Sequence, residues 1–399
     1  MIAVIITHTI DIWVIFLFFY PYFIVISSIY LYNKAKEMLK MDENNLKMLP
    51  PDLNPEKSQI LKQLIQSHKA LAELKGFSET IPNKNILINS VIINEAKDSS
   101  EIENIITTHD ELFKAMSKKN YNNPAAKEVV NYRRALWQGF ELIKERKLLT
   151  TNLIIEIQSM IENNNAGIRK VPGTVLKNPQ SGEIIYTPPD SETRIRELLN
   201  NLENYINEDT DGVDPLVKMA VIHYQFESIH PFYDGNGRTG RIINILYLVL
   251  KDILNSPILY LSKYIIENKN KYYSLFQEVR ENGSWDEWII YILKGIEETA
   301  AASLNLLKRI NNLIEKTAED MKAETPKIYS RELLELLFIE FYTKISFIQE
   351  GLGVTRKTAS NYLSTLEKAG FLSSEKLGRE KIYKNIRLFK LIKNINQKT

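Results

Sequence analysis

The chain has 399 residues, a formal net charge of +2 and a hydrophobic fraction of 44%. This length favours two or three compact units, and the apolar content excludes general disorder. The absence of cysteine excludes disulfides, thiolate zinc sites and a cysteine nucleophile. Because the net charge is close to zero, any nucleic-acid binding has to come from a local patch of basic residues.

Residues 1–40 differ in composition from the rest of the chain. The run from Ile12 to Tyr32 carries no charged residue and is long enough to cross a bilayer, and lysines follow it. These features predict a transmembrane anchor over residues 12–32 that tethers a cytoplasmic protein to the inner face of the membrane. The alternative is a start codon assigned too far upstream, and three later methionines offer such starts: Met38, Met41 and Met48.

The remainder of the chain predicts a mainly α-helical fold. Its expected parts are a helical region over 48–115, a helical core over 116–300, a connecting helix over 301–326 and a small domain over 327–390. Apolar residues at spacings of three and four support helices over most of this length. Residues 171–189 differ, because short β-like runs lie on either side of a Pro179–Gly182 turn. This segment predicts one β-hairpin.

A glycine-rich loop over residues 230–241, between two predicted helices, carries the strongest chemical signal. Gly235 and Gly237 allow a ligand to approach the backbone closely, and the N-terminal end of the following helix attracts anions. Arg238 and Arg241 are three residues apart, so both guanidinium groups lie on one side of that helix. Together these features predict a site for a polyphosphate.

Three other side chains of the loop complete the parts of a reaction site. An imidazole with an ordinary pKa of about 6.5, such as His230, suits a general base at neutral pH. Asp234 offers a carboxylate to Mg²⁺, and the Asn236 side chain offers a hydrogen-bond donor. A histidine beside a proline or a lone GNG turn is more often structural, so the inference depends on the combination. The combination indicates transfer from a nucleotide.

The loop, with the sequence HPFYDGNGRTGR, resembles the motif HPFxxGNGRxxR of the Fic family at every defining position. The similarity spans about residues 48–293 and includes three flanking segments: residues 167–169, 186–189 and 268–273. Residues 1–40 have no counterpart in the family pattern. The resemblance implies a helical Fic core that transfers AMP from Mg·ATP to a hydroxyl side chain (Tyr, Ser or Thr) of a protein, the chain itself included.

The resemblance also implies roles for individual residues. His230 takes the proton of the target hydroxyl, which attacks the α-phosphorus, and Asp234 binds Mg²⁺. The residues implied to contact the nucleotide are Gly235, Asn236, Gly237, Arg238, Thr239, Gly240, Arg241, Tyr272 and Tyr273. The hairpin, through Val175 and Tyr186, binds the target by adding its backbone as an extra strand.

An upstream segment matches the family's inhibitory helix pattern, Ser/Thr-x-x-x-Glu-Gly/Asn. The matching residues are Ser99, Glu103 and Asn104, of which the first two share a helix face because they are four residues apart. A carboxylate that reaches Arg241 occupies donors that the γ-phosphate needs. The resemblance therefore implies that Glu103 contacts the nucleotide site and keeps the enzyme inactive. The alternative is an ordinary solvated helix face rich in glutamate.

Residues 327–390 predict a winged helix-turn-helix domain. Helical patterns at 330–342 and 344–350 precede a helix from Thr355 to Ala369 and two strands around a basic turn. The residues expected to contact DNA are Arg356, Lys357, Asn361 and Arg379. A protein-interaction or dimerisation module is the alternative, and the sequence leaves the oligomeric state, a homodimer included, undetermined.

Two rival functions stay open at this point. On the same fold, the chain removes AMP from a modified protein, with Glu103 positioning a water, or transfers another phosphate-containing group. In the second rival, the chain is a DNA-binding regulator that senses a nucleotide. The complete set of base, metal ligand and arginines favours an active transferase over a sensor.

Overall fold

The computed structural model describes residues 46–81, 83–117, 123–177, 182, 184–377 and 380–393. The described chain divides into two compact units: residues 171–191 lie in the smaller one, and the residues from Met48 to Lys170 and from Glu192 onward lie in the larger one. The predicted transmembrane segment, 12–32, lies outside the described residues. Within the described part of the chain, no helix is both long enough and apolar enough to span a bilayer.

The predicted hairpin is present in the smaller unit. β1 (Leu176–Lys177) pairs antiparallel with β2 (Ile184–Tyr186), and Leu176 lies opposite Tyr186. The backbone N–H of Gly173 donates a 2.8 Å hydrogen bond to Oδ1 of Asp190, which joins the two ends of the hairpin. Val175 directly precedes β1, whereas the predicted turn residues 179–181 lie outside the described residues.

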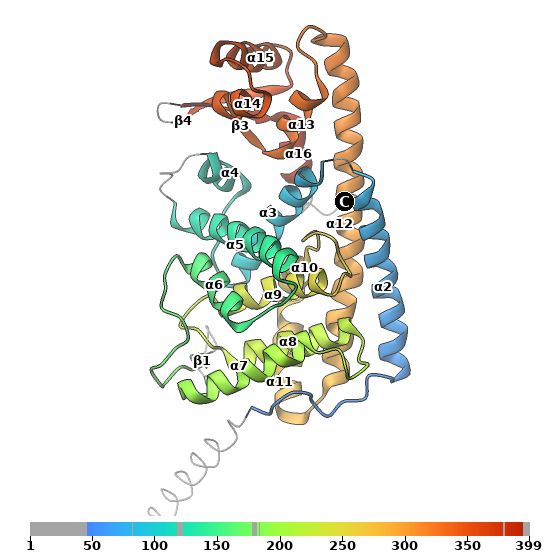
Figure 1. The fold of residues 1–399 in the computed structure, drawn as a ribbon, viewed down its shortest axis with the longest axis vertical. Helices are drawn as coiled ribbons and strands as arrows, with labels where there is room; N and C mark the ends of the chain where they lie inside the picture. Colours follow the sequence, from blue (N-terminus) through green and yellow to red (C-terminus); the bar gives the residue numbers. More distant parts are fainter. Residues whose placement is uncertain are drawn as a thin grey trace, which may run out of the picture. The chain divides into compact units, whose positions relative to one another are not determined.

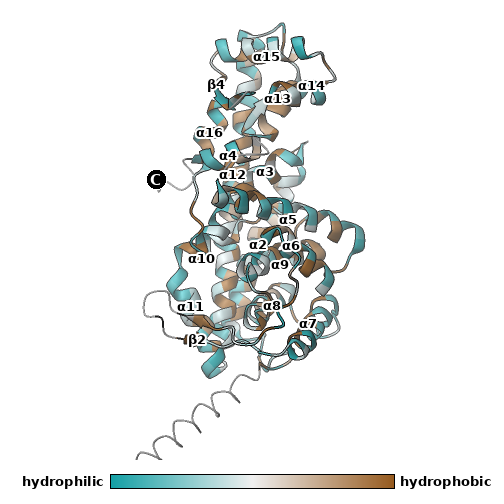
Figure 2. Ribbon diagram, turned by 90° about the vertical axis from the view of Figure 1, so that its left-hand side faces the viewer, coloured by the Kyte–Doolittle hydropathy of each residue, from teal (hydrophilic) through white to brown (hydrophobic). Residues whose placement is uncertain are grey.

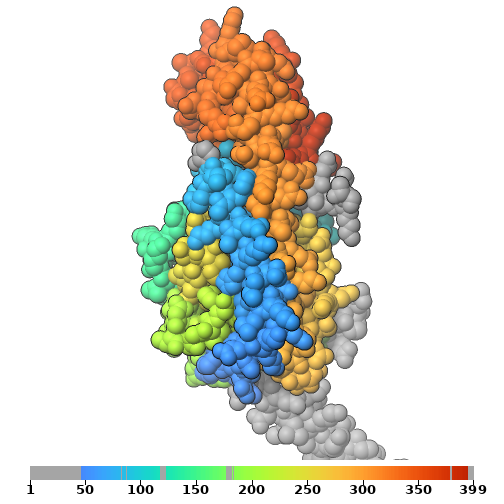
Figure 3. Space-filling view, turned by 90° about the vertical axis from the view of Figure 1, so that its right-hand side faces the viewer, coloured from blue at the N-terminus to red at the C-terminus, as the bar shows by residue number. Residues whose placement is uncertain are grey.

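Two long helices lie side by side in the larger unit, α2 (Ser58–Glu79) in blue and α12 (Trp285–Glu324) in orange in Figure 3. Ser67 of α2 donates a 2.7 Å hydrogen bond to the backbone carbonyl of Leu293 at this contact. The connecting helix predicted over residues 301–326 is part of a longer element, because α12 is one unbroken helix of 40 residues. Its buried stripe continues through Thr299 and Ala300 without a proline to interrupt it.

The centre of the larger unit is a pair of helices, α8 (Pro215–Ile229) and α9 (Asn236–Leu250), whose residues are buried on nearly every side. Such a pair is stable only when other helices cover it. The other helices of this region are α3 (Lys84–Ile102), α4 (His109–Ser117), α5 (Pro124–Arg146), α6 (Thr151–Glu162), α7 (Glu192–Asn207), α10 (Leu261–Glu267) and α11 (Lys269–Asn282). Of these, α5, α6 and α7 pack on the central pair (Figure 1), and the mixed colours of α7 in Figure 2 reflect its amphipathic sequence.

Side-chain caps determine where several helices begin. Asn123, Thr150 and Asp214 each accept a hydrogen bond from a backbone N–H in the first turn of α5, α6 and α8, respectively. Pro124 and Pro215 occupy the next position, where a missing N–H costs nothing. These caps are visible in the sequence, and α8 begins at Pro215 as expected.

The C-terminal part of the larger unit combines helices with a three-stranded sheet. Its elements are α13 (Arg331–Ile339), β3 (Tyr342–Lys344), α14 (Ile345–Leu352), α15 (Arg356–Lys368), β4 (Leu372–Leu377), β5 (Glu380–Asn385) and α16 (Ile386–Lys393). β5 lies between β3 and β4 and is antiparallel to both. The helix predicted over 330–342 is wrong at its end, because Tyr342 pairs with Lys384 of β5 and starts a strand. Aromatic and β-branched residues at this point favour a strand.

Gly295→Ala is expected to lower the free energy of unfolding by about 1–3 kcal/mol. A Cβ at this position of α12 would lie 2.7 Å from Cδ1 of the Tyr264 ring. Gly76→Ala in α2 is the matched control, since nothing lies within 4 Å of a Cβ there, and we expect it to stabilise by about 0.5–1 kcal/mol. Urea unfolding followed by circular dichroism measures both changes. Equal stabilisation by the two substitutions would mean that Tyr264 moves aside freely.

Candidate active site

The loop between α8 and α9 is held in one conformation by its own backbone and by Asn236. His230 ends α8 in a left-handed conformation, with φ 48° and ψ 57°, and Gly235 caps α9 with φ 76°. The Asn236 side chain accepts a 2.8 Å hydrogen bond from the N–H of Phe232 and donates a 2.8 Å bond to its carbonyl. The side-chain donor expected to reach a nucleotide is therefore occupied by the loop itself.

The first turn of α9 presents backbone donors at its start. The N–H of Thr239 already bonds to the carbonyl of Gly235 at 2.9 Å, so the N–H groups of residues 236–238 have no helical acceptor. Such a terminus binds anions. Thr239 and Gly240 follow directly in α9 and are both buried.

Three glycines of the loop each lie against a carboxylate. A Cβ would lie 2.6 Å from Oε1 of Glu162 at Gly235, 2.4 Å from Oε1 of Glu103 at Gly237, and 2.4 Å from Oε1 of Glu227 at Gly240. A side chain at any of these positions would therefore require the facing carboxylate to shift, and the positive φ of Gly235 favours glycine as well. Glu162 and Glu227 were not identified from the sequence, since they come from α6 and α8 and match no local pattern.

Arg241 is held by the C-terminal end of α3. Its Nε donates to Oγ of Ser99 at 2.7 Å, and its Nη2 donates to the backbone carbonyl of Ser99 at 2.8 Å and to Oε1 of Glu103 at 2.7 Å. Among the described residues, Glu103 supplies the only carboxylate within 4 Å of Arg241. The pair Ser99 and Glu103 thus meets the arginine that the sequence pattern indicated.

Arg238 is surrounded by carboxylates. Its Nε donates to Oε2 of Glu103 at 2.8 Å, its Nη1 donates to Oε2 of Glu128 at 3.0 Å, and its Nη2 lies 2.8 Å from Oε1 of Glu162. Oδ1 of Asp234 is 3.6 Å from Nη2. Glu103 therefore bridges both arginines, while Arg238 also connects α9 to α5 and α6.

The two arginines keep Glu103 charged. Burial opposes its ionisation, but the charges and hydrogen bonds of Arg241 and Arg238 outweigh burial and lower the pKa of Glu103. Burial raises the pKa of Glu227 to about 7, with Arg241 opposing this and Glu103 adding to it. The site thus holds an ionised Glu103 beside a Glu227 whose ionisation is opposed by burial.

The end of α3 explains why asparagine follows Glu103. Glu103 is the C-cap of α3, and Asn104 has a positive φ of 65°. Asparagine and glycine tolerate this left-handed conformation best, which accounts for the last position of the sequence pattern. Lys269 of α11 donates a 2.7 Å hydrogen bond to the carbonyl of Ile102 and so neutralises the helix terminus beside Glu103.

His230 lies at the entrance of the loop and is uncharged at neutral pH. Burial, with the charge of Arg169 second, lowers the pKa of His230 to about 4. Arg169 fixes this backbone, because its Nε donates to the carbonyl of His230 at 2.8 Å and its N–H to the carbonyl of Pro231 at 2.9 Å. The neutral imidazole is the form that accepts a proton.

Asp234 is the acidic side chain best placed for a cation near the phosphate site. It is 74% exposed, and Oδ1 accepts a 2.7 Å hydrogen bond from the N–H of Gly235. Within the described residues, no cluster of three or more His, Cys, Asp or Glu side chains is arranged to bind a metal by itself. Mg²⁺ on a nucleotide usually takes only one or two carboxylates in addition to phosphates and water, so one exposed aspartate fits this ion.

The two tyrosines of α11 occupy different environments. Tyr272 is 5% exposed, and its hydroxyl lies 3.0 Å from Nε2 of the buried His223. Tyr273 is 51% exposed, with its ring edge-on to Tyr272 at 5.2 Å. Tyr273 is therefore the tyrosine that a base or ribose can reach, whereas Tyr272 packs in the aromatic core. His223 is a packing residue, stacked on Trp288.

Three of the residues expected to contact DNA lie on α15, in the C-terminal part of the larger unit. Arg356, Lys357 and Asn361 are exposed on this helix. Arg379 lies outside the described residues. The basic residue Lys381 on the adjacent strand β5 is paired with Glu367 at 2.8 Å, which reduces the positive charge available there.

Three family models match this chain. The Fic/DOC family N-terminal model matches residues 61–141, the Fic/DOC family model matches 148–248, and the model of the C-terminal domain of protein adenylyltransferase SoFic-like matches 313–388. Together they cover more than half of the chain. The site residues 230–241 fall inside the second match, and Glu103 falls inside the first.

Curated relatives and one solved structure agree with these matches. A probable protein adenylyltransferase of Aquifex aeolicus is 29% identical over 188 residues, which are 46% of this chain and 53% of that protein. Protein adenylyltransferase fic-1 of Caenorhabditis briggsae is 26% identical over 144 residues, 36% of this chain and 27% of that protein. The chain therefore spans about half the length of the first relative and about a quarter of the second. A Fic family protein from Desulfovibrio desulfuricans shares the fold, with a TM-score of 0.53, 16% identity and coverage of 84% of this chain and 98% of that one.

Proposed function

Because this chain belongs to the Fic/DOC family, we propose that it transfers AMP from Mg·ATP to a tyrosine, serine or threonine hydroxyl of a protein. The observation that carries this proposal is the loop at 230–241, where a neutral histidine stands beside the N-terminus of α9 and two buried arginines. A base, an anion site and a positive clamp in one place are what nucleotide transfer requires.

His230 accepts the proton of the target hydroxyl as the hydroxyl oxygen bonds to the α-phosphorus. The bond from that phosphorus to the oxygen bridging to the β-phosphate breaks, and pyrophosphate leaves. The N–H groups at the start of α9 and the guanidinium of Arg241 hold the phosphates. Asp234 holds Mg²⁺, which neutralises phosphate charge when bound. Tyr273 borders the base or ribose.

Glu103 inhibits this reaction in the proposal. Its carboxylate lies 2.7 Å from Nη2 of Arg241 and 2.8 Å from Nε of Arg238, where phosphate oxygens would bind. An ionised carboxylate also repels the phosphates. In this state, ATP binds in a pose unsuited to in-line attack on the α-phosphorus.

The hairpin of the smaller unit is the proposed target-binding element. Strand addition to β1 or β2 through Val175 and Tyr186 would hold the backbone of the target in an extended form. Ile184 and Ile185 of β2 are exposed apolar side chains, as expected of a segment that gains a partner strand. This mode selects an extended conformation more than a particular target sequence.

The C-terminal part is proposed to be a winged helix. Two helices, α14 and α15, precede the antiparallel pair β4 and β5, and exposed Arg356, Lys357 and Asn361 lie on the second helix. DNA binding through this helix is the second candidate function. Retention on DNA that falls steeply with added salt, and that is lost in Arg356→Ala with Lys357→Ala, would support it.

The test of the main proposal compares two labels. The full chain with Glu103→Gly is incubated with target or alone, with Mg²⁺ and ATP labelled at either the α- or the γ-phosphate. AMP transfer places the α-label on protein and never the γ-label. Protein labelled from the γ-phosphate would show phosphoryl transfer instead. Absence of both labels, together with release of AMP from pre-modified protein, would favour the de-AMPylation alternative.

A further inference from the structure

The C-terminal part of the larger unit is docked on the same helix that ends in Glu103. α13 packs against α3, and β3 packs against α4. Asn89 of α3 donates a 3.0 Å hydrogen bond to the carbonyl of Ile339, and Asn83, the N-cap of α3, donates a 3.0 Å bond to Oε2 of Glu335. The inhibitory helix is therefore bound at its other end by residues of α13.

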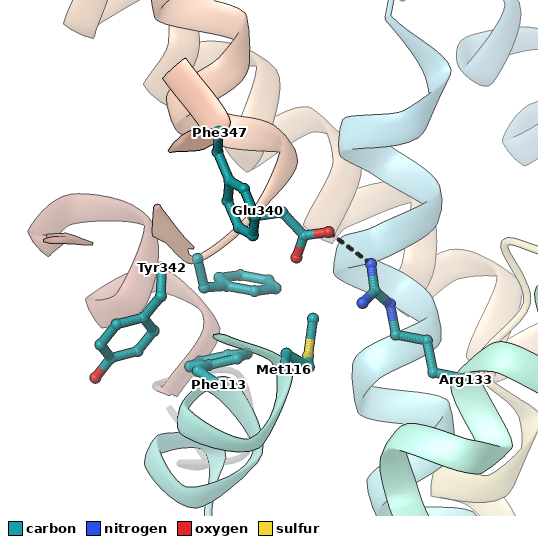
Figure 4. Close-up of a pocket in the computed structure, with 7 residues that line it drawn as sticks. Phe113, Met116, Arg133, Glu340, Tyr342 and Phe347 are labelled. Atoms are coloured by element: carbon teal, nitrogen blue, oxygen red, sulfur yellow. Dashed lines mark hydrogen bonds and ion pairs between the residues drawn. The ribbon is translucent and has the colours of Figure 1, made fainter. Parts of the chain in front are cut away.

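Arg133 of α5 joins three parts of the molecule through one nitrogen. Its Nη2 donates to Oδ1 of Asn89 and to Oε1 of Glu340, both at 2.9 Å. Asn89 belongs to α3 and Glu340 follows α13, so Arg133 connects the inhibitory helix to the docked part, and undocking breaks its bond to Glu340. The dashed line in Figure 4 marks the bond between Arg133 and Glu340, at the edge of the contact.

Aromatic side chains fill the rest of this contact incompletely. Phe113 of α4 stacks on Phe341 with ring centroids 4.2 Å apart, and Tyr342 donates a 2.8 Å hydrogen bond to Asp110. A cavity of about 60 Å³ remains between these rings and the pair Arg133 and Glu340 (Figure 4). A contact that leaves a void forgoes part of its dispersion energy, so it opens more readily than a fully packed core.

α3 links this contact to the active site. It is one uninterrupted helix from residue 84 to residue 102, with Asn89 near one end and Ser99 and Glu103 at the other. The carboxylate of Glu103 has to retreat by only about 1 Å to lose its hydrogen bond to Arg241. Helix shifts of about 1–2 Å are the usual scale of such transitions.

We propose that docking of residues 331–393 holds α3 where Glu103 contacts Arg241, with Arg133 as the positioning residue, and that loss of this docking releases the inhibition. The inference rests on the inhibitory role proposed for Glu103.

The experiment uses the full chain with Glu340→Ala or Glu340→Gln, each with and without Glu103→Gly. Initial rates of protein labelling from α-labelled ATP are measured. Glu340→Ala is expected to raise the rate by about fivefold or more. Glu340→Gln keeps an acceptor for Arg133 and is expected to raise it less. Neither changes the rate of Glu103→Gly, because the inhibitory carboxylate is already gone.

Glu367→Gln is the matched control, since it breaks an ion pair with Lys381 inside the C-terminal part and touches nothing of α3. It is expected to leave the wild-type rate unchanged. Hydrogen exchange of the α3 amides is the second readout, and it needs no activity. Faster exchange over residues 84–102 in Glu340→Ala, with wild-type exchange in Glu367→Gln, supports the coupling.

The outcomes separate this inference from the proposed function. If Glu103→Gly labels protein strongly, but Glu340→Ala matches wild type in both rate and α3 exchange, docking does not control the inhibitory helix and the coupling is wrong. If Glu103→Gly fails to label, the proposed function fails. Exchange in Glu340→Ala then still decides whether docking restrains α3.

Discussion

Glu103→Gly is expected to raise the rate of AMP transfer to protein by on the order of a hundredfold or more. The carboxylate makes two charge-assisted hydrogen bonds, 2.7 Å to Nη2 of Arg241 and 2.8 Å to Nε of Arg238. Each such bond contributes about 1.5–3 kcal/mol, and about 1.4 kcal/mol corresponds to a factor of ten. Initial rates with α-labelled ATP, measured on the full chain, give the change directly.

Glu128→Gln is the informative control for this prediction. Glu128 also neutralises Arg238, at 3.0 Å, but it does not contact Arg241. If inhibition depends on occupation of Arg241, Glu128→Gln leaves the rate close to that of wild type while Glu103→Gly raises it. Equal activation by both substitutions would instead mean that excess negative charge around Arg238 is the inhibitory element.

Mild acid does not relieve this inhibition. Although burial favours protonation, Arg241 and Arg238 hold the pKa of Glu103 below its ordinary value. A carboxylate with a lowered pKa keeps its stabilising contacts above its ordinary pKa and loses them only as the pH falls through the lowered value. The inhibitory contact therefore persists throughout the physiological pH range, and release needs movement of α3.

The sequence predicted the parts of the site that are contiguous in the chain. The loop at 230–241 and the pattern ending in Glu103 and Asn104 each occupy a few adjacent residues, and a single local conformation explains each. Gly237, for example, leaves room for the carboxylate of Glu103. In the sequence, only the family pattern connected Glu103 with this loop.

The parts that come from separate helices were not predictable in this way. Glu162 and Glu227 approach the loop from α6 and α8, and nothing in their neighbouring residues distinguishes them from solvated glutamates. The same holds for Arg133 and Glu340, whose contact depends on how α13 docks. The sequence predicted that the Asn236 side chain contacts the nucleotide, but its amide bonds to the backbone of Phe232. The partner of a side chain cannot be inferred from its residue type alone.

His230→Ala in the Glu103→Gly background is expected to lower the labelling rate by about a hundred- to ten-thousandfold, the usual contribution of a general base. The substitution removes the proton acceptor and leaves the phosphate site intact, because Arg241 and the N-terminus of α9 do not depend on the imidazole. ATP binding, measured by calorimetry, is therefore expected to stay within about threefold of the parent variant. A large loss of ATP affinity would mean that His230 acts in binding.

The pH profile of the Glu103→Gly variant tests the state of His230 more directly. Burial first, and the charge of Arg169 second, lower the pKa of His230 to about 4, while Glu103 opposes this shift. Removal of Glu103 therefore lowers the pKa further, so the imidazole remains an uncharged base from pH 8 down to about pH 5. Single-turnover rates are expected to be flat over this interval and to fall only in stronger acid. A midpoint near the ordinary value of about 6.5 would show that water reaches the imidazole once the inhibitory carboxylate is gone.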